Sequence, residues 1–68
     1  MAILNNLKKI RTERHLRQDD LAEAIHSCGR TIGRIERGER NPSLEMALEI
    51  ADFFELPVEE IFMLEQIK

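Results

Sequence analysis

The spacing of the apolar residues is the feature that most constrains how this chain can fold. In its first half they recur three or four positions apart, rather than in the alternating pattern of a half-buried strand. Residues at that spacing share one face of an α-helix, so the pattern predicts helices over about 5–14, 18–25 and 29–37. Asn5 or Asn6 is a suitable N-cap for the first helix, and Gly38 is suited to the end of the third. The three apolar faces comprise Leu7 and Ile10; Leu21, Ala22 and Ile25; and Ile32 and Ile35.

The second half of the chain predicts one longer helix and a short one. Pro42 and Ser43 form a stop-and-cap pair, and Pro57 ends the longer helix and begins a fifth at about 58–63. The two ends, AIL at 2–4 and FMLEQIK at 62–68, are short and apolar, and they could pair as an antiparallel two-stranded ribbon. The predicted fold class is therefore all-α, with five helices and at most this small ribbon. The apolar face of the longer helix comprises Leu44, Ala47, Leu48, Ile50, Ala51 and Phe54.

Length and cysteine content narrow the class of protein. At 68 residues the chain is expected to form one domain, 1–68, whose core gives only marginal stability. Cys28 is the only cysteine, so there is no internal disulfide, and with His26 it offers too few ligands for a metal site. The sequence shows no signal peptide and no apolar run of membrane-spanning length. We expect a cytoplasmic protein that is not an enzyme, needs no metal or cofactor and does not associate with membranes.

Charge is distributed unevenly along the chain. The net charge is -3, yet residues 30–40 hold four arginines against two glutamates. Residues 41–68 hold seven acidic groups and one lysine. One interpretation is a basic face on an acidic body, which would suit nucleic acid. The alternative is an ordinary solvated helix surface.

The second and third predicted helices are separated by very few residues, about 26–28. Counting from Gln18 as the first position, Ala22 is the fifth, Ile32 the fifteenth and Ile35 the eighteenth. In a helix-turn-helix, a small residue at the fifth position lets the two helices cross closely. Apolar residues at the other two positions hold the second helix against the core, and its opposite face can enter a major groove. Such residues also occur in small helical domains that bind no DNA, so both interpretations remain open from spacing alone.

Longer motifs resemble one known family. The segments NLKKIR at 6–11, LRQDDLAEAI at 16–25 and TIGRIERGERNPSLEMALEIADFFELPVEEIF at 31–62 are similar to the helix-turn-helix domains of phage Cro and repressor proteins. The combination of IERG with NPSL and ALEIA is highly specific, and the resemblance covers nearly the whole chain. It implies a five-helix DNA-binding domain, with the helix at about 29–37 as the recognition helix. It also implies a transcriptional regulator, most often a repressor.

The resemblance assigns roles to individual residues. Arg30 and Arg34, four positions apart and opposite Ile32 and Ile35, would read base edges, since an arginine can donate two hydrogen bonds to guanine. Thr31 would contact a phosphate or a thymine methyl group. Backbone phosphates would be contacted by Arg17, Gln18, Arg37, Arg40 and Asn41.

Two further sets of residues are implied to be structural. Arg11 and Glu36 match positions that form a partly buried ion pair in relatives, and Gln18 would brace the recognition helix. Members of the family bind palindromic sites as symmetric dimers, and the most apolar end of this chain is the candidate dimer surface. Ile61 and Phe62 could belong to the core of one protomer instead. The candidate dimer residues are Leu56, Pro57, Ile61, Phe62, Met63, Leu64 and Ile67.

Some positions depart from the family pattern. The turn residue, usually glycine, is His26, and the usual capping serine of the recognition helix is Cys28, a poor cap. Gly29 has no side chain at a position that often reads bases, and Gly33 is expected in mid-helix on the outer face. Each glycine lowers helix propensity by about 1 kcal/mol relative to alanine. These departures leave room for a second hypothesis, a protein-interaction module such as an antitoxin or a regulator's partner.

Overall fold

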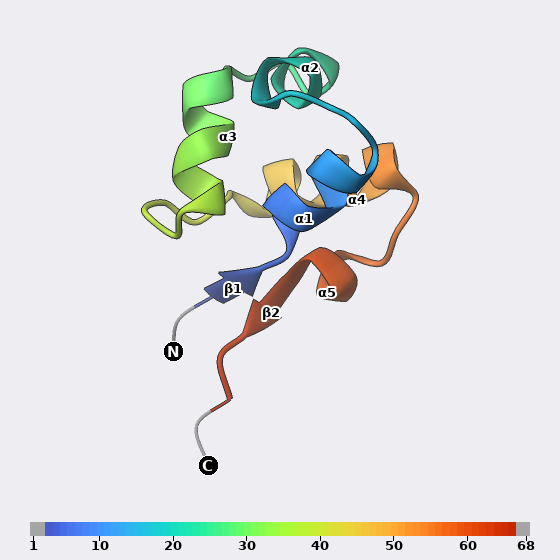
Figure 1. The fold of residues 1–68 in the computed structure, drawn as a ribbon. Helices are drawn as coiled ribbons and strands as arrows, with labels where there is room; N and C mark the ends of the chain where they lie inside the picture. The colour runs from blue at the N-terminus through green and yellow to red at the C-terminus, as the bar shows by residue number, and fades with distance from the viewer. Residues whose placement is uncertain (1–2, 67–68) are drawn as a thin grey trace.

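Five helices and two short strands follow one another along the chain in the computed structural model, which describes residues 3–66. The helices gather around one core, and the two strands lie together at the end of the molecule from which both ends of the chain emerge (Figure 1). The predicted all-α fold with five helices and a small ribbon is confirmed. In chain order the elements are β1 (Ile3–Asn5), α1 (Leu7–Glu13), α2 (Gln18–Ala24), α3 (Gly29–Glu36), α4 (Leu44–Phe54), α5 (Val58–Ile61) and β2 (Phe62–Leu64).

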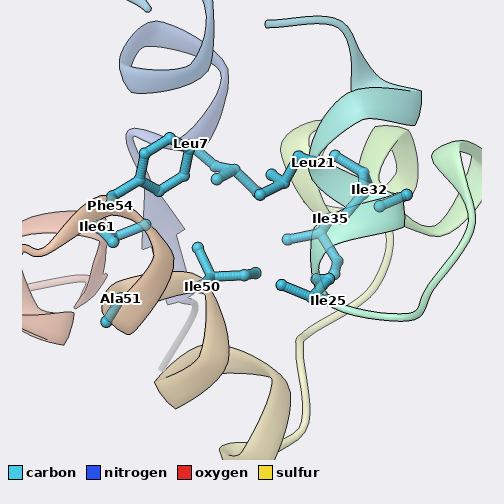
Figure 2. Close-up of a cluster of buried hydrophobic side chains, with 10 residues drawn as sticks. Leu7, Leu21, Ile25, Ile32, Ile35, Ile50, Ala51, Phe54 and Ile61 are labelled. Carbon is cyan, nitrogen blue, oxygen red and sulfur yellow. The ribbon is translucent and has the colours of Figure 1, made fainter.

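A single hydrophobic core fixes the positions of the helices. Leu7, Leu21, Ile32 and Ile50, one from each of the first four helices, have no exposed surface. Figure 2 shows these side chains converging on a common interior. Because α1, α2 and α3 have only seven or eight residues each, they would be marginal in isolation, and packing must hold them. No helix within residues 3–66 is long and apolar enough to cross a bilayer.

The longest helix, α4, buries a narrower face than the sequence pattern predicts. Its N-cap is Ser43, whose Oγ accepts a hydrogen bond from the Met46 amide at 3.1 Å. Leu44 and Leu48 were expected in the core, but they are 76% and 52% exposed. They lie at the edge of the apolar face, on the side toward Asp52, where no other helix covers them within the described part of the chain. The buried residues of α4 are Ala47, Ile50, Ala51 and Phe54.

The two strands pair in antiparallel fashion, with Ile3 opposite Leu64 and Asn5 opposite Phe62. The predicted ribbon is therefore confirmed over β1 and β2, while residues 2, 67 and 68 of the prediction lie outside the described residues. The fifth helix, expected to reach residue 63, ends at Ile61. That boundary was wrong because pairing with β1 draws the backbone into an extended conformation directly after the helix. The Asn6 amide donates a hydrogen bond to the Ile61 carbonyl at 2.9 Å, which fixes the junction.

Candidate nucleic-acid interface

The α2 and α3 helices form a helix-turn-helix unit. Ala22 of α2 is 2% exposed, and Ile32 and Ile35 of α3 are 0% and 1% exposed. The third helix stands at one edge of the molecule, beside α2 and beyond α1 and α4 (Figure 1). Two isoleucines thus anchor one face of α3 in the core, and its opposite face is available to a partner.

The turn between the two helices is built without glycine. His26 adopts a left-handed conformation with φ of 56°. The Ser27 amide donates to the Ala22 carbonyl at 2.8 Å, which closes the end of α2. Left-handed backbone is uncommon for residues other than glycine, although histidine is among those enriched there. The turn therefore keeps the geometry that the family's glycine provides, with some backbone strain.

Cys28 is the N-cap of α3, and its side chain forms no regular capping hydrogen bond. The thiol Sγ lies 3.2 Å from Thr31 Oγ1. This hydrogen bond, with smaller contributions from the Thr31 amide and then from the amide and charge of Arg30, lowers the pKa of the Cys28 thiol. No group of three or more histidine, cysteine or acidic side chains within residues 3–66 is placed to hold a metal ion.

The exposed face of α3 is rich in arginine. Arg30 and Arg34 are exposed and lie one helical turn apart, with half-buried Thr31 beside them. Arg37 and Arg40 are exposed at and beyond the end of the helix, and Arg37 Nε donates to Glu39 Oε2 at 2.6 Å. No ion pair between residues 3–66 engages Arg30, Arg34 or Arg40. Exposed guanidinium groups without an ion-pair partner in the described residues can bind phosphates or the acceptor atoms of guanine.

Glu36 joins three helices at the rear of this face. Arg11 Nε and Nη2 donate to Glu36 Oε2 and Oε1 at 2.6 and 3.1 Å, and Arg11 Nη1 donates to the Leu16 carbonyl at 2.7 Å. The two side chains are 9% and 3% exposed. The hydrogen bonds that Arg11 donates to Glu36 raise the pKa of the Arg11 guanidinium, against the opposing effect of burial. Gln18 Nε2 also donates to Glu36 Oε1 at 3.1 Å, so α1, α2 and α3 are tied together at one carboxylate.

The two glycines of α3 face α2. Gly33 is buried, so its expected place on the outer face was wrong: a Cβ there would lie 3.1 Å from Gln18 Nε2 and 3.2 Å from Arg37 Nη1. A Cβ on Gly29 would lie 2.1 Å from Asp19 Oδ1. The absence of side chains thus lets α2 approach α3 closely. Sequence spacing gave no sign of these contacts, because they join residues on opposite sides of the turn.

Arg17, a candidate phosphate contact, is engaged with its own helix. Its amide donates to Asp20 Oδ2 at 2.8 Å, and its Nη2 lies 3.2 Å from Asp20 Oδ1. These bonds lower the pKa of the Asp20 carboxyl. Asp20 thus supplies the acidic half of a capping box, whereas the arginine side chain has no acceptor with which to bind the Asp20 amide in return. Because the Arg17 side chain is 82% exposed, it remains accessible to an anion.

The candidate dimer residues divide into core and surface. Ile61 has no exposed surface, so it belongs to the core of the protomer and offers nothing to a second copy. Leu56 and Phe62 are half-buried against that core, and Ile67 lies outside the described residues. Leu64, at 57% exposed, and Leu4, at 49%, flank an apolar groove of about 650 Å³ on the ribbon. The sequence pattern indicated Leu4 as part of the ribbon but did not indicate that it lines this surface. The groove is lined by Leu4, Glu59, Phe62, Met63, Leu64 and Gln66.

Comparison with known proteins agrees with this geometry. The profile of the helix-turn-helix family matches residues 7–61, from the start of α1 to the end of α5. The chain belongs to this family. The match confirms the resemblance to the Cro and repressor type of domain that the motifs around α2, α3 and α4 indicate.

Relatives come from archaea and bacteria. An uncharacterized HTH-type transcriptional regulator of Methanocaldococcus jannaschii is 43% identical over 61 residues, covering 90% of this chain and 92% of that protein. YgzD of Bacillus subtilis, an uncharacterized HTH-type transcriptional regulator, is 34% identical over 62 residues, covering 91% and 94%. Among solved structures, a Bacteroides fragilis protein described as a candidate DNA-binding protein has a TM-score of 0.79 and 25% identity, covering 88% and 97%. The BldD DNA-binding domain of S. venezulae has a TM-score of 0.67 and 32% identity, covering 79% and 81%.

Proposed function

We propose that this protein is a DNA-binding transcriptional regulator that places α3 in the major groove of double-stranded DNA. The observation that carries the proposal is the division of α3 into two faces. Ile32 and Ile35 are buried on one side, and Arg30 and Arg34 are exposed and free of ion pairs within residues 3–66 on the other. In this proposal the two arginines and Thr31 contact bases. Phosphates are bound by Arg17, Gln18, Arg37, Arg40 and Asn41, which position the protein without specifying sequence.

The direct test is selection of binding sites from a randomised DNA duplex pool, with the wild type and with Arg34→Ala. The wild type should select a guanine-containing consensus, and Arg34→Ala should relax it at one position in each half-site. Arg14→Ala is the matched control, because Arg14 follows α1 rather than lying on α3, and its guanidinium lies over the Phe54 ring of α4 at 5.0 Å. Weak, salt-sensitive binding without a consensus would contradict the proposal.

We further infer that the regulator binds a palindromic operator as a homodimer and acts as a repressor. The support is the exposed apolar groove on the ribbon, which a symmetry mate would cover. Two copies would then hold their recognition helices about 34 Å apart, one turn of DNA. A domain bound across a promoter excludes other proteins from it, so repression is the simplest outcome of occupancy.

Two leucines of similar exposure test the dimer. Leu64→Glu on the ribbon should shift the sedimenting species from dimer to monomer and weaken operator binding. Leu48→Glu on α4, at a side chain 52% exposed against 57% for Leu64, should leave both unchanged. A wild type that sediments as a monomer even on its selected DNA would refute the dimer while leaving DNA binding intact.

A protein-interaction module, such as an antitoxin or a regulator's partner, is the second candidate function. The observation that favours it is the exposed edge of α4, where Leu44 and Leu48 lie beside the acidic residues Glu45 and Asp52. An apolar and acidic surface suits a basic partner. A stable complex that survives the double change of Arg30 and Arg34 to alanine but is lost in Leu48→Glu would support this function over DNA binding.

A further inference from the structure

The first residue of the recognition helix has no side chain, and the space beside it is occupied by α2. A Cβ built on Gly29 would meet Asp19 Oδ1 at 2.1 Å and Asp19 Cγ at 3.1 Å. The Asp19 amide nitrogen would be 3.5 Å away, an ordinary contact distance. The Asp19 carboxylate therefore lies where a side chain of residue 29 would begin. The carboxylate of Asp19 on α2 thus lies at the position that a side chain of residue 29 on α3 would otherwise fill.

The Asp19 carboxylate is exposed, unlike the groups around it that are engaged in the fold. Its neighbour Asp20 accepts three hydrogen bonds from Arg17. Within residues 3–66, no ion pair and no side-chain hydrogen bond involves Asp19. The Asp19 carboxylate is thus a free hydrogen-bond acceptor at the start of α3. It lies beside Gly29, the residue that precedes Arg30.

The chemistry of the major groove decides what such an acceptor can read. Phosphate oxygens repel a carboxylate, and so do guanine O6 and N7 and thymine O4. Adenine offers the N6 amino group, but its N7 acceptor lies beside it. Cytosine offers the N4 amino group and has no acceptor of its own in this groove, and aspartate and glutamate are its usual partners.

We propose that Asp19 is a specificity-determining residue that selects a cytosine at the half-site position facing the start of α3. The inference rests on the proposed DNA-binding function and adds an acidic reader from α2 to the arginine readers of α3. It also accounts for Gly29: the glycine leaves the space through which the carboxylate reaches the groove. One such contact should give about tenfold discrimination against the other bases.

The test is binding-site selection with four variants beside the wild type. Asp19→Ala should lose the cytosine preference at one position of each half-site and keep the rest of the consensus. Asp19→Asn should shift that position toward adenine, because an amide can pair with N6 and N7 together. Glu23→Gln is the matched control: it removes the same charge one turn further along α2, and it should leave the consensus unchanged.

Gly29→Ala moves the carboxylate without removing its charge. The new methyl group would displace the end of a flexible side chain and no backbone atom, so the fold should survive. We expect loss of the same cytosine preference as in Asp19→Ala. Retention of that preference in Gly29→Ala would show that the position of the carboxylate does not matter and would overturn the inference.

The outcomes separate this inference from the function on which it rests. If Asp19→Ala binds every sequence more tightly with an unchanged consensus, Asp19 only repels DNA, and the inference fails while the proposed function stands. If the wild type selects no consensus at all, the proposed function fails and the inference falls with it. A consensus altered at one position by Asp19→Ala and Gly29→Ala, but not by Glu23→Gln, supports both.

Discussion

At the scale of single residues, the Arg11–Glu36 pair is the contact whose loss should matter most for stability. Both side chains are nearly covered, and Arg11 makes three hydrogen bonds to Glu36 and Leu16. Arg11→Ala leaves the Glu36 carboxylate buried with only Gln18 as a donor, so the free energy of unfolding should fall by about 3–5 kcal/mol. Urea titration followed by circular dichroism measures the loss.

An exposed ion pair in the same protein serves as the control. Glu39→Gln breaks the Arg37–Glu39 pair, whose side chains are 58% and 51% exposed. Water and salt screen such pairs, so the unfolding midpoint should hardly move. Equal losses in Arg11→Ala and Glu39→Gln would show that burial of the first pair has no energetic consequence.

A second prediction at this scale concerns the Cys28 thiol. The Thr31 hydroxyl is the main group that lowers the pKa of this thiol. A lower pKa in the folded state means that folding gains stability as pH rises toward the ordinary thiol pKa, and loses that gain as pH falls through the folded value. Alkylation by iodoacetamide should therefore reach half its maximal rate at a lower pH in the folded protein than in urea. Thr31→Ala should move the folded midpoint upward, and identical midpoints in all three samples would exclude the effect.

At the scale of elements, the first four helices each end in or just before a left-handed residue, and only one of these residues is glycine. His15, His26 and Glu55 have φ of 58°, 56° and 57° at the ends of α1, α2 and α4, and Gly38 has φ of 77° after α3. Glu55→Gly should raise the free energy of unfolding by about 1 kcal/mol, which is the strain of a left-handed residue less the entropy that glycine loses on folding. Gly38→Ala should lower it by a similar amount. Thermal unfolding tests both, and a destabilised Glu55→Gly would show that its side chain contributes more than its backbone strain costs.

Sequence spacing was sufficient to locate these elements but not to orient every residue on them. The three- and four-residue repeats through Leu7, Leu21 and Ile32 placed the helices to within a few residues, because burial in one core imposes that period. The end of α5 was missed because the partner of Phe62 is Asn5, at the other end of the chain. Gly33 was misplaced because Gln18, on another helix, covers it. Both errors concern contacts between distant segments, which the spacing of apolar residues within one segment cannot reveal.

At the scale of the whole molecule, charge is separated between the recognition surface and the C-terminal part of the chain. Arginines gather on and just after α3, whereas residues 41–66 carry only acidic charges. The protein should then approach DNA with α3 facing the duplex, because the phosphates repel the acidic helices α4 and α5. Arg40 lies beyond α3, outside the face that carries Arg30 and Arg34, so its proposed contact is with a phosphate alone.

The salt dependence of binding therefore measures both the role of Arg40 and the number of protomers on the DNA. Each phosphate contact contributes about 0.9 to the slope of log affinity against log salt concentration. Arg40→Ala should keep the selected consensus and reduce that slope by about 2 if a dimer binds, since the contact is lost twice, and by about 1 if a monomer binds. Asp52→Asn, which changes the net charge by one unit in the opposite direction on α4, should leave the slope unchanged. An unchanged slope in Arg40→Ala would place this side chain away from the backbone, and the basic surface would then end with α3.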